Sequence, residues 1–173
     1  MKKRQNDTIS RILGYALNLE RTAKAFFQSS LERVQIPNAL SAIGRLVDEE
    51  TGHVAVITEA IERLGCSEPG CPEYIQQALK PIRYFDKQAQ KEFLREIREN
   101  PVVPDVTVFR TAWHIEKDIS EFYEKAATRA EGPTQKILQQ LCAFEKYHER
   151  FFRKYHDELS RLYSRMYEKR PWA

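Results

Sequence analysis

Apolar side chains recur at three- and four-residue steps along most of this chain, which is the spacing of one face of an α-helix. Prolines are excluded from helix interiors, and their positions leave four long proline-free stretches. Asn38 and Asp105 stand where their side chains could cap the second and third stretches. The pattern predicts four amphipathic helices, at about residues 8–34, 38–64, 105–130 and 134–166.

The lengths of the connections indicate the topology. Helices of roughly 25 to 30 residues would be ~40 Å long, as in a four-helix bundle. The turns at Gln35–Pro37 and Gly132–Pro133 are short, so each joins two helices into an antiparallel hairpin. A crossover of about 40 residues, 65–104, separates the hairpins, and two segments in it have the pattern of shorter helices, Tyr74–Leu79 and Phe85–Ile97. We therefore expect an all-α fold.

Composition favours one helical domain over residues 1–173. Only 6 glycines are present, which leaves little material for β turns. The net charge of +3 is small, so we expect no nucleic acid partner. No apolar run approaches the ~18 residues of a membrane helix, and polar residues follow the basic start where a signal peptide would be apolar. We expect a cytoplasmic protein that does not bind membranes.

One glutamate interrupts each of the four apolar stripes. These residues are Glu20, Glu50, Glu116 and Glu145. Burying an unpaired carboxylate costs several kcal/mol, and four converging carboxylates would also repel one another. Buried ion pairs with basic side chains are one alternative, but no Lys or Arg recurs on the inward-facing stripes. Metal ions are the more direct means of neutralising them.

Two histidines follow these glutamates by three residues. The segments are Glu50-Thr51-Gly52-His53 and Glu145-Lys146-Tyr147-His148. Residues at i and i+3 share a helix face, so both side chains of each pair point to the same place. Glu20 precedes Glu50 by 30 residues and Glu116 precedes Glu145 by 29, so the same hairpin occurs twice, offset by 96 or 95 residues.

In these six residues the chain resembles the ferritin-like di-iron carboxylate superfamily and, within it, the rubrerythrin-like branch. The resemblance covers about residues 8–166 and implies a ferritin-like four-helix bundle. It differs in two features: no rubredoxin domain with C-x-x-C knuckles is present, and Ile119 stands where a seventh glutamate is often found. The resemblance implies that two metal ions are held by Glu20, Glu50 and His53 and by Glu116, Glu145 and His148, with Glu50 and Glu145 bridging.

The resemblance also implies an activity. The expected protein is a non-haem di-iron oxidoreductase of oxidative-stress defence that reduces peroxide or dioxygen. Two iron ions are the implied cofactor, with manganese or zinc as substitutes. Electrons would come from a separate donor such as a rubredoxin-like protein, and an acidic donor is favoured because the surface around a neutralised centre is more basic than the net charge suggests.

Two other functions stay open at this point. One is a di-iron hydroxylase of an organic substrate, which the 65–104 crossover could help to bind. The other is a non-enzymatic, ferritin-like iron-binding or storage protein. The internal duplication favours a homodimer over a storage shell.

Further side chains are weaker candidates. His114 and His156 have ordinary surface or packing roles in our interpretation, while Cys66 and Cys71 are free thiols or, alternatively, a redox pair. Tyr123 and Tyr147 are either hydrogen-bond donors or radical-transfer residues near the centre, or aromatic packing residues. The second ring nitrogens of the two expected ligand histidines need partners, for which the candidates are Asp48, Glu49, Glu121 and Glu149.

Overall fold

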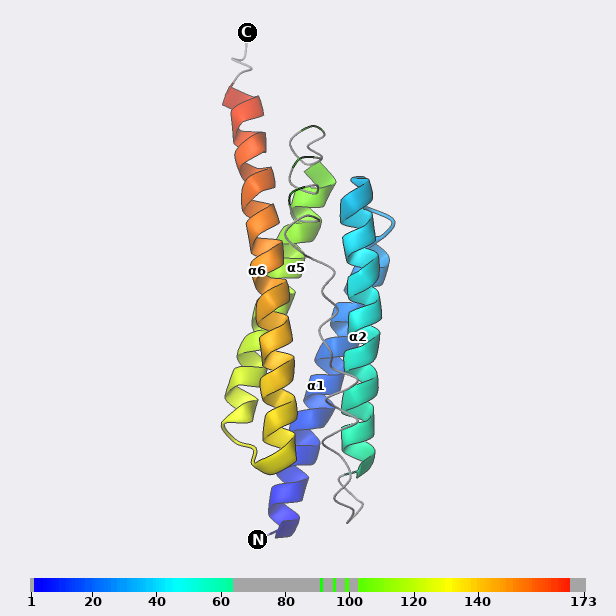
Figure 1. Cartoon of the computed structure of the whole chain (residues 1–173), viewed down its shortest axis with the longest axis vertical. Helices are drawn as coiled ribbons and strands as arrows, with labels where there is room; N and C mark the ends of the chain where they lie inside the picture. The colour runs from blue at the N-terminus through cyan, green and yellow to red at the C-terminus, as the bar shows by residue number, and fades with distance from the viewer. Residues whose placement is uncertain (1, 64–90, 92–94, 96–98, 100–102, 169–173) are drawn as a thin grey trace.

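Four long helices make up the described part of the chain (Figure 1). The computed structural model describes residues 2–63, 91, 95, 99 and 103–168. In this part of the chain every element is a helix, so the all-α prediction is confirmed. The helices are α1 (Lys2–Ser30), α2 (Pro37–Arg63), α5 (Val103–Ala127) and α6 (Gly132–Glu168).

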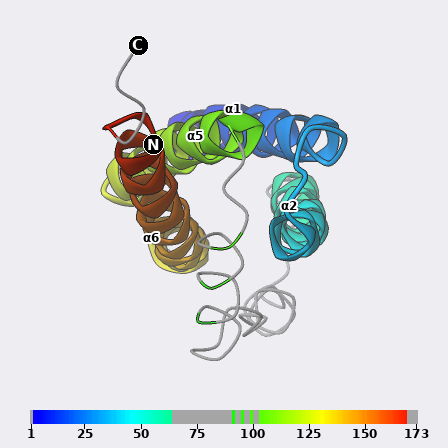
Figure 2. The same ribbon diagram turned by 90° about the horizontal axis from the view of Figure 1, so that it is seen from above.

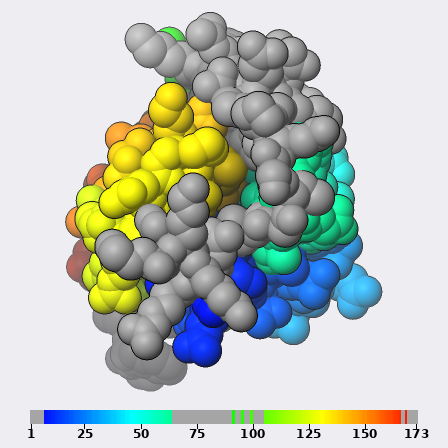
Figure 3. All heavy atoms as spheres, turned by 90° about the horizontal axis from the view of Figure 1, so that it is seen from below, coloured from blue at the N-terminus to red at the C-terminus, as the bar shows by residue number. Residues whose placement is uncertain are grey.

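The helices pair as two antiparallel hairpins. α1 runs antiparallel to α2, and α5 runs antiparallel to α6 (Figure 1). The hairpins also meet, because α1 packs against α5, and Figure 2 shows all four helices arranged around a common axis. α2 ends at the end of the bundle opposite to that at which α5 begins. Figure 3 shows the end at which α1 begins, α2 ends and α5 turns into α6.

The predicted crossover with its short helices, within residues 65–104, lies largely outside the described residues. Lys91, Arg95 and Glu99 are described and are helical. In the ranges that the structure covers, no helix is both long enough and apolar enough to cross a membrane.

The helix ends differ from the predicted ones, since α1 spans Lys2–Ser30 where about 8–34 was predicted, and two predicted caps are not formed. α2 begins at Pro37, whose missing N–H costs nothing at a first helical position, so Asn38 lies inside the helix and does not cap it. Asp105 lies in the first turn of α5, and its carboxylate accepts hydrogen bonds from the backbone N–H groups of Gln35 and Ile36 instead. Both cap predictions are therefore wrong, the second because a distant turn uses the carboxylate.

Aromatic side chains fill the core where the two hairpins meet. Phe152 on α6 stacks on Phe27 of α1, with ring centroids 5.7 Å apart, and tilts against Phe109 of α5 at 5.6 Å. All three rings are fully buried. Removal of such rings from water stabilises the bundle by roughly 1.5–3 kcal/mol for each side chain. This apolar core surrounds a group of buried charged residues contributed by all four helices.

Candidate metal centre

Six buried side chains from the four helices form one polar cluster. α1 contributes Glu20, α2 contributes Glu50 and His53, α5 contributes Glu116, and α6 contributes Glu145 and His148. The four glutamates have no exposed surface, and the two histidines are also buried. The i, i+3 spacing brings each histidine beside the glutamate of its own helix, at 3.5 Å for His53 and Glu50 and at 3.2 Å for His148 and Glu145. All six candidate ligands of the sequence analysis thus lie together.

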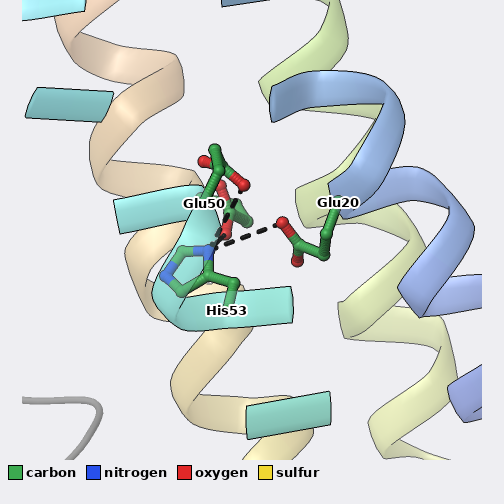
Figure 4. A group of neighbouring side chains, drawn as sticks. Glu20, Glu50 and His53 are labelled. Atoms are coloured by element: carbon green, nitrogen blue, oxygen red, sulfur yellow. Dashed lines mark ion pairs between the residues drawn. The ribbon is translucent and has the colours of Figure 1, made fainter. Parts of the chain in front are cut away.

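The first half of the cluster surrounds the Nδ1 atom of His53. This atom is 3.5 Å from Oε2 of Glu20 and 3.0 Å from Oε1 of Glu145. Figure 4 shows Glu20 reaching from α1 towards His53 and Glu50 on α2. Glu20, Glu50, His53 and Glu145 offer ligand atoms that all lie within 4.8 Å of one another, which is close enough to hold one ion.

The second half surrounds the Nδ1 atom of His148. This atom is 3.7 Å from Oε2 of Glu116 and 3.9 Å from Oε1 of Glu50. The ligand atoms of Glu50, Glu116, Glu145 and His148 also lie within 4.8 Å of one another. Glu50 and Glu145 belong to both groups, so the cluster has the donor set of two adjacent ions that share two carboxylates.

Most of the buried polar atoms of this cluster lack a hydrogen-bond partner within the described residues. Seven atoms meet no group there with hydrogen-bond geometry: Glu20 Oε2, both oxygens of Glu50, His53 Nδ1, both oxygens of Glu116 and Glu145 Oε1. Within the described ranges, the ion-pair partners of the four carboxylates are the two histidines and no Lys or Arg. Buried acceptors without donors are costly, whereas carboxylate and imidazole donors fit divalent metal ions well.

The pKa values of the cluster also show that its negative charge exceeds what the two histidines can offset. Burial and the neighbouring carboxylates of Glu20 and Glu145 raise the pKa of Glu50 well above its usual value, and burial and Glu145 do the same for the pKa of Glu116. Burial opposes ionisation of Glu145 as well, but His53 and His148 hold its pKa well below the usual value. Without a metal ion, retained protons must therefore offset part of the negative charge.

The ring nitrogen of His148 that points away from the cluster has an acidic partner. Its Nε2 atom is 2.7 Å from Oε2 of Glu49, so Glu49 is the residue that orients this imidazole. The other three acidic candidates are not bonded to the histidines. Asp48 is exposed, Glu121 pairs with lysines, and Glu149 accepts a hydrogen bond from Ser120.

The two candidate tyrosines have different environments. Tyr123 is fully buried, and its hydroxyl donates a hydrogen bond to Oε1 of Glu20. Burial and the charge of Glu20 raise the pKa of Tyr123 well above its usual value, so its hydroxyl stays protonated. Tyr147 is 37% exposed, and its ring lies edge-on to that of His148. Of the two, Tyr123 is the hydrogen-bond donor to the cluster.

The remaining candidates lie apart from the cluster or outside the described residues. His114 is exposed and stacks on Trp113, and His156 contacts Asp157 and Ser160 on its own helix, as expected of surface or packing residues. Cys66 and Cys71 lie outside the described residues. The sequence analysis did not single out Phe144, whose ring lies 5.7 Å from that of His53. Its position directly before Glu145, which repeats that of Glu49 before Glu50, was the available signal.

Comparison with known proteins gives one family match. The family model described as Rubrerythrin matches residues 11–156, a range that includes all six residues of the cluster. The chain has no match among curated proteins or among solved structures.

Proposed function

The chain belongs to the rubrerythrin family, and on this basis we propose that it is a non-haem di-iron oxidoreductase. The proposed reaction is the reduction of peroxide or dioxygen, with electrons supplied by a separate donor protein such as a rubredoxin-like protein. The observation that carries the proposal is the buried cluster itself, in which seven polar atoms lack hydrogen-bond partners among the residues that the structure describes. Two divalent cations would satisfy these atoms and neutralise four carboxylates.

The proposed ligand assignment follows from the two overlapping groups. Glu20 and His53 would hold one metal ion, Glu116 and His148 would hold the other, and Glu50 and Glu145 would contribute to both. A set of carboxylates and imidazoles suits iron and also manganese or zinc, so availability decides which metal is bound. We propose iron because the chain belongs to the rubrerythrin family.

The chemistry that two iron ions would supply here is the pair of electrons needed to cleave an O–O bond. The protein holds the donor atoms in place. Glu49 accepts a hydrogen bond from the Nε2–H group of His148 and so favours the tautomer whose Nδ1 lone pair faces the cluster. The hydroxyl of Tyr123 fixes one oxygen of Glu20, so that the other oxygen faces His53. Reduction of one peroxide to two waters consumes two protons and the two electrons that the donor replaces.

The test is metal binding followed by oxidation. The metal-free protein, loaded anaerobically with Fe²⁺, is expected to bind two ions per chain, and hydrogen peroxide is expected to oxidise both. Glu50→Ala and His148→Ala each remove a ligand and should lower the binding to fewer than two ions at the same free Fe²⁺ concentration. His156→Ala is the matched control, because His156 lies on the same helix and contacts Asp157 and Ser160 instead of the cluster.

A Glu50→Ala or His148→Ala variant that still binds two ions as tightly as the parent would contradict the ligand assignment. A parent protein that binds two Fe²⁺ ions but is not oxidised by peroxide or dioxygen would contradict the proposed reaction and leave the centre itself intact.

A further inference from the structure

The two hairpins place equivalent ligands around the centre but surround them with different neighbours. The repeat relates α2 to α6 with an offset of 95 residues and α1 to α5 with an offset of 96. Under these offsets Glu49 is equivalent to Phe144, and Phe27 is equivalent to Tyr123. Each pair consists of one polar and one apolar residue, so the symmetry of the ligands does not extend to the residues behind them.

The first difference lies behind the histidines. His148 has the carboxylate of Glu49 at 2.7 Å from its Nε2 atom, and the Glu49 side chain is only 11% exposed. The equivalent neighbour of His53 is the aromatic ring of Phe144, with the ring centroids 5.7 Å apart. Among the residues that the structure describes, no carboxylate is bonded to Nε2 of His53. Within the described part of the chain, one imidazole therefore has a carboxylate behind it and the other has an aromatic ring beside it.

The second difference concerns Glu20 and Glu116, each of which belongs to only one of the two groups of ligand atoms. Oε1 of Glu20 accepts a hydrogen bond from the hydroxyl of Tyr123. The residue equivalent to Tyr123 in the first hairpin is Phe27, which stacks on Phe152 and has no hydroxyl to donate. Among the described residues, neither oxygen of Glu116 has a hydrogen-bond partner. A hydroxyl thus fixes the carboxylate of Glu20, and the described residues offer no such donor to Glu116.

The two differences act on different ligands, since the carboxylate partner lies behind His148 and the hydroxyl donor lies behind Glu20. A carboxylate bonded to the far nitrogen of a ligand histidine makes the imidazole a stronger donor and fixes its orientation. A neutral hydroxyl fixes a ligand carboxylate but adds no charge, whereas Glu49 adds a negative charge beside the centre, so the difference at the histidines decides the order. We propose that the two metal positions are unequal: the position of Glu116 and His148 binds its ion more tightly and fills first, and the position of Glu20 and His53 is the weaker, exchangeable one. This inference rests on the proposed dinuclear centre.

The size of the difference can be bounded. Loss of a partner behind a metal ligand typically costs about 10- to 100-fold in metal affinity. The difference at the histidines alone is of this kind, so we expect the two affinities to differ by at least about 10-fold. Glu49, Tyr123 and Phe144 act through the ligands and are positioning residues.

The test is a titration of the metal-free full chain with Co²⁺, whose binding can be followed by absorption and by calorimetry. The parent is expected to bind two ions in two resolved steps. Crystals grown with one equivalent of Co²⁺ are expected to give an anomalous peak beside His148 and none beside His53.

Two pairs of variants assign the difference to its cause. Glu49→Gln keeps the size of the side chain but removes its charge, so it should weaken the tighter step by about 10-fold and bring the two steps together. Asp48→Asn makes the same charge change at the exposed neighbouring residue and should leave both steps unchanged. Phe144→Glu should strengthen the weaker step, whereas the uncharged control Phe144→Gln should not.

The outcomes separate this inference from the function on which it rests. Two ions bound with equal affinity by the parent and by Glu49→Gln, or a first ion located beside His53, would overturn the inequality and leave the dinuclear centre standing. A parent that binds no ion would overturn the proposed function and the inference together. Circular dichroism of each variant verifies that its helices are intact.

Discussion

Glu20 is bonded on both sides to residues that are far from it in the sequence. One of its oxygens accepts a hydrogen bond from Tyr123 on α5, and the other lies 3.5 Å from Nδ1 of His53 on α2. The position of Glu20 on an apolar stripe predicted that it would be buried. It did not predict the donor, because packing against α1 was an equally good explanation for the ring of Tyr123. At the scale of single residues, the polar contacts required the structure.

Tyr123→Phe removes the hydroxyl and leaves Oε1 of Glu20 buried without a donor. We expect the free energy of unfolding of the metal-free protein to fall by about 1–3 kcal/mol, as is usual for a buried group that loses its partner. Urea unfolding followed by circular dichroism measures this change. Tyr15→Phe is the control, because Tyr15 is 57% exposed, and it should alter stability by no more than about 0.5 kcal/mol. Equal stability of both variants would contradict the role of the Tyr123 hydroxyl.

The hairpins are held together by Asp105 as well as by apolar packing. Its carboxylate lies 3.1 Å from the backbone nitrogen of Gln35 and 3.2 Å from that of Ile36, so it links the α1–α2 turn to the first turn of α5. Proline positions predicted both short turns, because their effect on a helix is local. The partners of Asp105 are 69 and 70 residues away and depend on how the hairpins dock.

Asp105→Ala leaves two backbone donors of this turn without their acceptor, one of them buried. We expect a loss of about 1–3 kcal/mol in the free energy of unfolding. The matched control is Asp118→Ala, the same change at an exposed residue of the same helix, which should cost no more than about 0.5 kcal/mol. Denaturant unfolding of both variants decides the question, and similar losses in the two would show that Asp105 acts only through helix propensity or charge.

The charge inside the bundle affects the stability of the whole molecule. Burial and neighbouring carboxylates raise the pKa values of Glu50 and Glu116, and the carboxylates also raise the pKa values of His53 and His148 although burial opposes this. Above the unfolded pKa values of these groups, the folded metal-free chain therefore holds more protons than the unfolded chain. Its stability must fall as the pH rises through the folded values. Glu145, with a lowered pKa, contributes in the opposite sense, but only at acidic pH.

We expect metal-free and metal-loaded protein to respond to pH in opposite directions. The melting temperature of the metal-free chain should fall as the pH rises above about 6.5, the ordinary pKa of histidine, because its retained protons are lost. That of the loaded chain should rise, because ligands must lose protons to bind metal and affinity increases with pH. A free metal concentration of about 100 times Kd adds about 2.7 kcal/mol for each site. Scanning calorimetry in both states tests this, and a metal-free chain that becomes more stable towards pH 9 would contradict it.

The sequence by itself determined the features that depend on the spacing of residues close together in the chain. Four helices, two hairpins joined by short turns, and six inward-facing ligand candidates at i, i+3 and repeat spacing all follow from residues close together in the chain. That these six bind metal stays a prediction, as does the single domain.

Only the tertiary structure decided which residues stand behind the candidate ligands. Tyr123 reaches Glu20 across 103 residues and Glu49 reaches His148 across 99, while Phe144 takes the equivalent place beside His53. Four acidic residues were equally suitable by sequence, because the rotation of each helix about its axis and its depth in the bundle are set by packing along its whole length. Those quantities are not local, and they surround a symmetric set of candidate ligands with unsymmetric neighbours.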